Sequence, residues 1–257
     1  MIIDVNAYLG HWPFRQLRYN TAEKLIELMN KFGLDKTVVS SLNAIFYKNC
    51  QSGNEELATE TREHRERFIP FATLNPMYPG WEDDFEQCVE EFNMKGLRLF
   101  PHYHNYKLTD DASIRLIHEA TQRCMPVSIP MRMVDRRQRH WLDSARDLSL
   151  SEFEEIIKQC SETTFILTEG VGWENSQLVN VFKSCNFLIE ISRLTSVLQE
   201  SIPRLLDALG PTKLAFGTGM PFKYPRPALL KMEILEASEE VKEQIYWRNI
   251  AGILGDT

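Results

Sequence analysis

The sequence is poor in the residues that build most metal sites and disulfide scaffolds. It contains 6 histidines and 5 cysteines in 257 residues, and no two cysteines stand as Cys-x-x-Cys. An odd number of widely spaced cysteines is typical of reduced thiols, and it argues against a zinc knuckle or a disulfide framework. We therefore expect a cytoplasmic protein whose cysteines stay free.

Clustered positive charge and long apolar runs are missing too. The formal net charge is −7, whereas nucleic-acid binding needs clustered lysines and arginines to neutralise phosphates. There is no run of 18 apolar residues, and the first residues show no basic segment followed by an apolar one. We therefore expect no membrane span and no signal peptide. Small molecules remain as the predicted partners, without nucleic acid or membrane.

What is present is a regular alternation of strand-like apolar runs with amphipathic helical segments. In residues 25–32 the apolar side chains recur every three or four positions, and Gly33 follows as a helix terminator. Eight strands, each followed by a helix, predict a (β/α)8 TIM barrel that occupies residues 1–257 as one domain. An open doubly wound sheet is the alternative. The predicted strands are Ile2–Asn6, Thr37–Leu42, Phe68–Leu74, Gly96–Phe100, Val127–Arg132, Thr164–Thr168, Phe187–Ile191 and Lys213–Phe216.

One long insertion follows the fifth predicted strand. Its sequence, "MVDRRQRHWLDSARDLSL" (residues 133–150), is too rich in charge to belong to the core. We predict that this insertion lies over the mouth of the barrel as a lid.

Candidate binding residues gather where the predicted strands end. In a barrel of this kind the active site lies at the C-terminal ends of the strands. Most candidates there are cations and imidazoles, and guanidinium groups bind carboxylates through two parallel hydrogen bonds. We therefore predict a small anionic substrate with a carboxylate group. The predicted binding residues are Asn6, Tyr8, His11, Arg98, Arg132, Arg136 and His140.

Arg98 has a second interpretation. Because it lies within a predicted strand, it is also placed to pair with Glu169 or Glu190 inside the barrel and neutralise that carboxylate. Both interpretations stay open for the sequence alone.

Five segments carry a family resemblance. In chain order, "IIDVNAYLG", "GLRLFPHYHNYKL", "PVSIPMR", "FGTGMPF" and "WRNIAGILG" resemble the signature segments of the amidohydrolase-related family. That family consists of metal-dependent TIM-barrel hydrolases and decarboxylases of the amidohydrolase superfamily. The resemblance spans nearly the whole chain, and it implies a barrel with hydrolase or decarboxylase activity.

The ligand positions of that family are altered in this sequence. Members of that family typically carry His-x-His after strand one, a histidine on strand five, a histidine on strand six and an aspartate on strand eight. Here those positions hold Asn6 and Tyr8, then Pro130, then Thr168 or Glu169, and finally Gly219. At most one of these residues offers a group that binds zinc well. We therefore expect no metal at the usual position.

A reaction without a metal is what the resemblance then implies. The superfamily also contains lactone hydrolases in which arginines and histidines polarise a carbonyl group. On that model an arginine from strand four or five would stabilise the oxyanion, and a histidine after strand four would activate water. A carboxylate would replace the missing aspartate as the base. The predicted catalytic residues are His102, His104, Glu169 and Asp135.

A metal enzyme with relocated ligands is the second hypothesis. It requires side chains at the ends of several strands to converge and bind zinc or manganese. These residues would be His11, His102, His104 and Glu169.

A barrel that binds a metabolite without catalysis is the third hypothesis. It predicts that side chains such as Tyr8, Phe100 and Met220 fill the pocket. Trp12 and Phe14 are predicted to form pocket walls or a contact between copies in a homo-oligomer.

Overall fold

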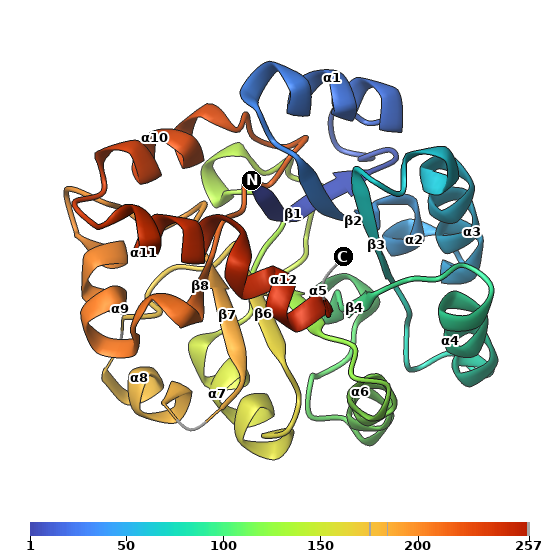
Figure 1. The fold of residues 1–257 in the computed structure, drawn as a ribbon. Helices are drawn as coiled ribbons and strands as arrows, with labels where there is room; N and C mark the ends of the chain where they lie inside the picture. Colours follow the sequence, from blue (N-terminus) through green and yellow to red (C-terminus); the bar gives the residue numbers. More distant parts are fainter. Residues whose placement is uncertain (175, 184, 256–257) are drawn as a thin grey trace.

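The computed structural model describes residues 1–174, 176–183 and 185–255, and it confirms the predicted barrel (Figure 1). Eight parallel strands form one sheet in the order β1 to β8, with helices around it. The ring closes between β1 and the segment after β8, where Tyr8 N donates to Met220 O at 2.9 Å and Gly219 N donates to Asn6 O at 2.8 Å. The strands are β1 (Ile3–Leu9), β2 (Lys36–Ser41), β3 (Phe68–Ala72), β4 (Gly96–Arg98), β5 (Val127–Pro130), β6 (Phe165–Thr168), β7 (Phe187–Glu190) and β8 (Leu214–Ala215).

Local signals fix several helix ends. Gly33 closes α1 with a left-handed φ of +68°, as predicted, and Ser149 forms a capping box with Glu152 at the start of α7. None of the helices in the described residues is long and apolar enough to cross a membrane. The helices are α1 (Ala22–Phe32), α2 (Asn43–Phe46), α3 (Cys50–Thr61), α4 (Trp81–Glu90), α5 (Pro101–His104), α6 (Asp111–Gln122), α7 (Leu150–Gln159), α8 (Ser176–Phe182), α9 (Ser201–Leu209), α10 (Arg226–Ile234), α11 (Glu239–Glu243) and α12 (Asn249–Leu254).

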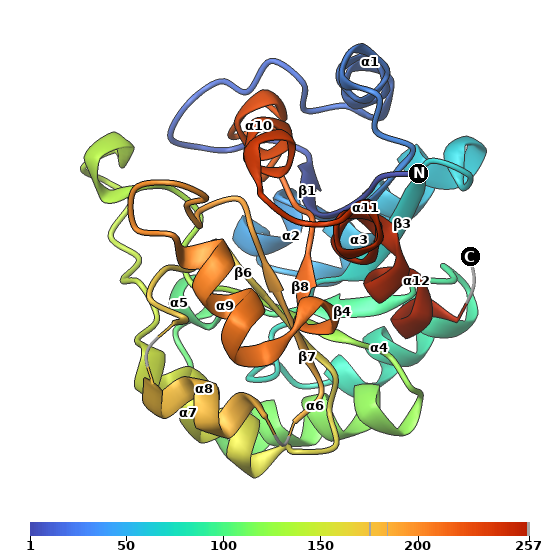
Figure 2. The ribbon, with the colours of Figure 1, turned by 60° about the vertical axis from the view of Figure 1, so that its left-hand side comes forward.

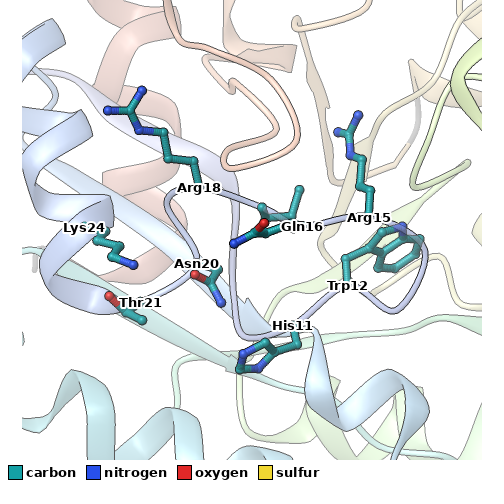
Figure 3. A pocket seen from close by; sticks show the side chains of 9 residues that line it. His11, Trp12, Arg15, Gln16, Arg18, Asn20, Thr21 and Lys24 are labelled. Carbon is teal, nitrogen blue, oxygen red and sulfur yellow. The ribbon is translucent and has the colours of Figure 1, made fainter.

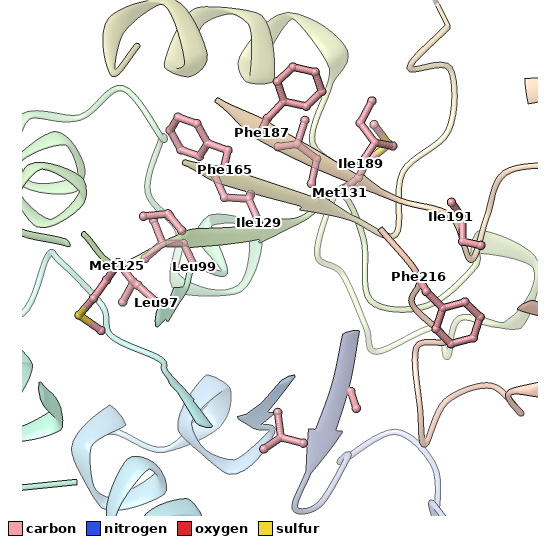
Figure 4. Close-up of a cluster of buried hydrophobic side chains, with 14 of the residues drawn as sticks. Leu97, Leu99, Met125, Ile129, Met131, Phe165, Phe187, Ile189, Ile191 and Phe216 are labelled. Atoms are coloured by element: carbon pink, nitrogen blue, oxygen red, sulfur yellow. The ribbon is translucent and has the colours of Figure 1, made fainter. Parts of the chain in front are cut away.

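The outer face of the strands carries the larger apolar core (Figure 4). Ile129 and Met131 point outward from β5 and the residue after it, and Phe187 and Ile189 do the same on β7, at the two-residue spacing of a strand. Each such buried side chain contributes about 1.5–3 kcal/mol by leaving water. The helices cover this layer, so the inner face of the strands is left to build a site.

A polar layer lies inside the barrel between two apolar layers. The lower apolar layer includes Ile166 and Leu188, and it is closed by residues of α12 such as Ile250. Two positions further along the same strands come the buried polar residues Thr168 and Glu190. The upper apolar layer fills the mouth, and it consists of Tyr8, Trp12, Leu17, Leu42, Ile45, Phe100, Met133 and Val134, with Phe14, Tyr103 and Phe222 packed against it. We call this upper layer the mouth cluster.

An irregularity in β1 brings Asn6 into the polar layer. The pairing of β1 with β2 shifts between Asp4 and Ala7. Val5 packs in the lower apolar layer, yet the side chain of the next residue, Asn6, also points inside, where it meets two carboxylates. A bulge of this kind re-aims a side chain that regular alternation would turn outward.

The predicted lid lies over the barrel mouth. Met133 and Val134, directly after β5, are buried in the mouth cluster. Asp147 holds the rest of the segment, because Arg139 Nη2 donates to it at 2.6 Å and Arg136 Nε at 3.0 Å. The segment is therefore packed onto the C-terminal ends of the strands.

Candidate functional site

A group of charged and polar side chains occupies the barrel interior below the mouth cluster. Its centre is Glu169, which follows β6 and has a left-handed φ of +57°. That conformation costs a residue other than glycine about 1–3 kcal/mol, so the surrounding contacts must hold it. We call the group the inner charge cluster, and its members are Asn6, Glu169, Glu190, Ser192, Arg193 and Lys223.

Glu169 is held by two cations and an amide. Lys223 Nζ lies 2.8 Å from Oε1 and 3.0 Å from Oε2 of the carboxylate. Arg193 Nε donates to Oε2 at 2.6 Å, and Asn6 Nδ2 donates to Oε1 at 2.8 Å. Both carboxylate oxygens of Glu169 are therefore satisfied by donors from three different strand ends.

Glu190, the last residue of β7, is the second buried carboxylate of the cluster. It accepts hydrogen bonds from Glu169 N at 3.1 Å, from Ser192 Oγ at 3.0 Å and from Ser192 N. Asn6 Nδ2 also lies 3.5 Å from Glu190 Oε2, so it touches both carboxylates. Neutral donors, rather than cations, hold Glu190.

The two carboxylates therefore differ in how readily each takes up a proton. Although burial raises the pKa of Glu169, the charges of Lys223 and Arg193 outweigh it and hold that pKa below its usual range. Burial, together with the neighbouring Glu169 carboxylate, raises the pKa of Glu190. Glu169 stays ionised, and Glu190 is the member of the pair that takes up a proton more readily.

Two glycines of the segment "FGTGMPF" make room for this cluster. A Cβ atom at Gly217 would stand 2.3 Å from Glu190 Cγ. A Cβ atom at Gly219 would stand 2.3 Å from Lys223 Cε and 2.4 Å from Glu169 Oε1. Contacts this short would force Glu190, or Glu169 and Lys223, to move, so the observed positions of these side chains depend on glycine at both sites.

The mouth cluster covers the inner charge cluster with aromatic rings. Tyr8 and Trp12 both make edge-to-face contacts with Phe222, at centroid distances of 5.8 and 5.0 Å. The hydroxyl groups of Tyr8 and Thr168 are buried without a regular hydrogen-bond partner. Tyr8 and Phe100 therefore fill the mouth as the third hypothesis expects, whereas Met220 packs in the outer core.

A basic cleft opens beside the mouth, between the loop after β1 and the loop after β8. Figures 1 and 2 show that α1 and α10, which follow these loops, are neighbours, and Tyr19 meets Tyr224 at 6.1 Å. The cleft combines a cavity of about 620 Å³, seen in Figure 3, with one of about 160 Å³ that shares four lining residues with it. Among the described residues that line either cavity, none is acidic, and the basic ones are His11, Arg15, Arg18, Lys24 and Lys223.

Lys223 connects the basic cleft to the inner charge cluster. Its side chain is 29% exposed and lines the smaller cavity, while its ammonium group contacts Glu169 and donates to Ser192 Oγ at 2.7 Å. Arg15 Nη2 donates to Phe222 O at 2.9 Å and ties the two loops together at this point.

The predicted residue Arg98 is turned into the barrel wall. It is fully buried, and its guanidinium group donates to Ala7 O and Val5 O at 2.9 Å each and to Ser128 Oγ at 3.1 Å. Neither Glu169 nor Glu190 forms an ion pair with Arg98 in the described structure, so the prediction that Arg98 pairs with one of them is wrong. Substrate binding by Arg98 stays a prediction.

The two predicted catalytic histidines lie together on α5, on the lid side of the barrel. His104 Nε2 is 3.2 Å from Ile45 O, and neither ring nitrogen of His102 has a hydrogen-bond partner. Burial lowers the pKa of His102 to about 3 and that of His104 to about 4. His102 also borders a separate cavity of about 710 Å³ under the lid. Both imidazoles are therefore neutral near pH 7.

The other predicted residues divide between the cluster and the lid. Arg193 Nη1 donates to Asp135 at 3.3 Å, which links Asp135 to the inner charge cluster. Arg132 and Arg136 both pair with the lid residue Asp147. His140 is exposed and stacks on an aromatic ring of the mouth, and His11 lines the basic cleft. Asn6 donates to Glu169 as described, and Tyr8 belongs to the mouth cluster that covers these two residues.

The residues at the family's metal position do not fit a divalent metal. Pro130 and Gly219 offer no ligand atom, Asn6 directs its amide nitrogen at the carboxylates, and the ammonium group of Lys223 already contacts both oxygens of Glu169. The relocated set fails as well. No group of three His, Cys, Asp or Glu side chains in the described residues could hold a metal, so His11, His102, His104 and Glu169 do not converge.

Sequence reasoning missed Lys223, Ser192 and Arg193. Ser192 and Arg193 lie two and three residues after the end of β7, and Lys223 directly follows "FGTGMPF". Their position at strand ends is the signal that could have found them. The basic residues Arg15 and Arg18, on the loop after β1, carried the same signal.

Comparisons with known proteins give the family. The family model described as amidohydrolase matches residues 11–255. No curated protein sequence matches the chain significantly. Solved structures do match the chain, but at sequence identities so low that they show a shared fold alone.

Three decarboxylases illustrate that likeness. 5-Carboxyvanillate decarboxylase from Sphingomonas paucimobilis has a TM-score of 0.73 at 14% identity, covering 100% of this chain and 99% of that chain. 2,6-Dihydroxybenzoate decarboxylase from Rhizobium has a TM-score of 0.73 at 13% identity, covering 98% of each chain. Dihydroxybenzoic acid decarboxylase from Polaromonas sp. JS666, with bound manganese and 2-nitroresorcinol, has a TM-score of 0.74 at 15% identity, covering 98% and 96%. Because the family model matches nearly the whole barrel, the chain belongs to the amidohydrolase family.

Proposed function

We propose that the protein acts in the cytoplasm on a small anionic carboxylate, which it binds in the basic cleft and decarboxylates. The observation that carries this proposal is the lining of the cleft. Cations line a cavity at the C-terminal ends of β1 and β8, without an acidic residue among the described ones, and the cavity leads to Lys223. An anion gains from such a lining, because each fixed cation offers charge-assisted hydrogen bonds.

The neighbouring structures support a carboxylate as the substrate. Several are decarboxylases of benzoate-type acids, and an aromatic acid would suit this cleft too, because Trp12 and Phe222 line its two cavities. Hydrolysis is the other reaction that the family allows. We place decarboxylation first because the fold neighbours are named for it.

The chain's own residues define the roles in this proposal. Arg15 and Arg18 would bind the substrate anion from the outer side of the cleft. Lys223 would stabilise the electron pair left on carbon when the bond to the carboxyl group breaks and carbon dioxide leaves. That carbon would then take its proton from water, because all three N–H groups of Lys223 already contact Glu169 and Ser192. Glu169 would hold Lys223 in place, since both of its oxygens contact the ammonium group.

The test is a panel of aromatic and aliphatic carboxylates, followed by mass spectrometry for products that have lost carbon dioxide. Arg18→Ala should raise the KM of any substrate found about tenfold, which corresponds to about 1.4 kcal/mol. Arg226→Ala is the matched control, because Arg226 is an exposed arginine that pairs with Glu233 on α10. Absence of binding by every carboxylate, with wild-type protein folded, would overturn the proposal.

One observation favours a second candidate, a barrel that binds a metabolite without converting it. Tyr8, Phe100 and Phe222 pack over the inner charge cluster and leave Lys223 as its exposed link to the cleft. The same panel separates the two candidates. Saturable binding with no product from any bound carboxylate would support the binding protein.

A further inference from the structure

We propose that the ammonium group of Lys223 is a built-in cation at the point where the metal of family members is held. The protein then needs no divalent ion to neutralise its buried carboxylates, and it acquires a metal site when Lys223 is removed. This inference concerns the charge balance of the barrel, and it does not depend on which substrate the cleft accepts.

The contacts of Lys223 are those of a bound cation. Its Nζ has three oxygen atoms around it: Glu169 Oε1 at 2.8 Å, Glu169 Oε2 at 3.0 Å and Ser192 Oγ at 2.7 Å. A lysine ammonium group has three N–H donors, so this set uses all of them. The charge stands against a carboxylate that is only 2% exposed. A buried carboxylate without such a partner would be strongly unfavourable.

Gly219 links this arrangement to the altered metal position. The resemblance to the family places an aspartate where this chain has Gly219. A Cβ atom there would overlap Lys223 Cε and Glu169 Oε1, at 2.3 and 2.4 Å. The lysine side chain therefore passes through the space that a side chain at position 219 would need. The position of Lys223 and the absence of a side chain at position 219 therefore depend on each other.

The oxygen atoms that Lys223 leaves behind would suit a hard divalent ion. Without Lys223, Glu169 keeps one cationic partner, Arg193, and Glu190 lies beside it. Asn6 Oδ1 is buried in the same region without a hydrogen-bond partner. Carboxylate, amide and hydroxyl oxygens are the ligands that manganese and magnesium prefer. Neutralising the extra negative charge would drive the uptake.

The experiment compares metal uptake by wild-type protein and by Lys223→Ala. Each is incubated with Mn²⁺, dialysed, and measured for manganese by elemental mass spectrometry and for thermal stability with and without Mn²⁺. The wild-type chain should retain no stoichiometric manganese and show no shift in Tm. Lys223→Ala should retain about one ion per chain and gain several degrees in Tm.

Two controls locate the effect. Lys231→Ala removes another half-buried lysine, one that donates to Ile191 O and Ser192 O rather than to a carboxylate, so it should retain no manganese. Glu169→Gln added to Lys223→Ala should abolish the gained uptake. Stoichiometric manganese in the wild type, or in Lys231→Ala, would overturn the proposal.

Lys223→Gln guards against failure of the alanine variant to fold, because it keeps a hydrogen-bond donor for Glu169 while it removes the charge. It should also take up manganese. Folded Lys223 variants that remain metal-free would overturn the proposal. So would failure of both variants to fold even when Mn²⁺ is present during expression and refolding, since the ion should then replace the missing charge.

Discussion

Burial has opposite outcomes for charge in the inner charge cluster and at the two α5 histidines. In the cluster, the Glu169 carboxylate keeps its charge because Lys223 and Arg193 surround it. On α5, burial lowers the pKa of His102 to about 3 and of His104 to about 4, so both imidazoles are neutral. The two histidines that the sequence marks as catalytic are uncharged, and a lysine outside any motif carries the central cation.

The difference has a simple physical cause. Burial penalises the charged form of every ionisable group, and a nearby opposite charge offsets that penalty. Glu169 has two such partners. His102 has none at its ring nitrogens, and the neighbouring His104 and Arg139 disfavour a proton further. A buried side chain can therefore look catalytic by type and yet be inert by environment.

The largest effect should come from removing the built-in cation. Lys223→Met should lower the free energy of unfolding at pH 7 by about 3–5 kcal/mol, because it leaves a buried carboxylate with one partner fewer. Chemical denaturation without added metal measures this. Arg226→Met, in a pair whose arginine side chain is 56% exposed, should cost less than about 1 kcal/mol. Equal losses in both variants would erase the distinction between buried and exposed pairs.

Neutralising the carboxylate itself should have a smaller, pH-dependent effect. The pKa of Glu169 is lower in the folded than in the unfolded chain, so its ionised form contributes stability above the unfolded pKa of about 4.3. That contribution is lost as pH falls through the folded pKa. Glu169→Gln should therefore cost about 1.5–3 kcal/mol at pH 7 and progressively less below pH 4. Unfolding curves across this range measure it, and a constant loss at all pH values would contradict the assignment.

His102 is the reverse case in one respect, because folding disfavours its charged form, although wild-type stability again falls as pH falls. Because the folded pKa of His102 lies below its unfolded value, the unfolded chain binds an extra proton below about pH 6.5, and wild-type stability falls there. His102→Phe should remove that loss. The free energy of unfolding of this variant, relative to wild type, should be about 2 kcal/mol higher at pH 5 than at pH 8. Unfolding free energies at the two pH values measure the gain. No change between them would mean that His102 is solvated in the folded protein.

The smallest effect is expected at the exposed edge of the lid. Arg136 is 74% exposed although it contacts Asp147, so Arg136→Ala should change the free energy of unfolding by less than about 1 kcal/mol. Denaturation at low and moderate salt measures this. A raised KM with unchanged stability would identify Arg136 as a substrate contact, as the sequence predicts. A large loss of stability would show that Asp147 depends on this arginine.

The sequence by itself determined the barrel and much of where to search. Apolar periodicity predicts all eight strands, and Gly33 ends a helix where local backbone chemistry requires it. Glu169 was placed correctly, directly after β6, whereas Asn6, predicted as the last residue of its strand, lies within β1. Such features depend on residues close together in the chain, so a pattern can reveal them.

Only the tertiary structure decided which of these side chains meet. Lys223 reaches Glu169 from 54 positions away, because Gly219 leaves its side chain a path and the left-handed conformation of Glu169 places the carboxylate at its end. The bulge in β1 aims Asn6 inward, and Arg98 bonds to carbonyls of that same strand. These contacts follow from register, close approach and burial across the whole barrel, which no local pattern records.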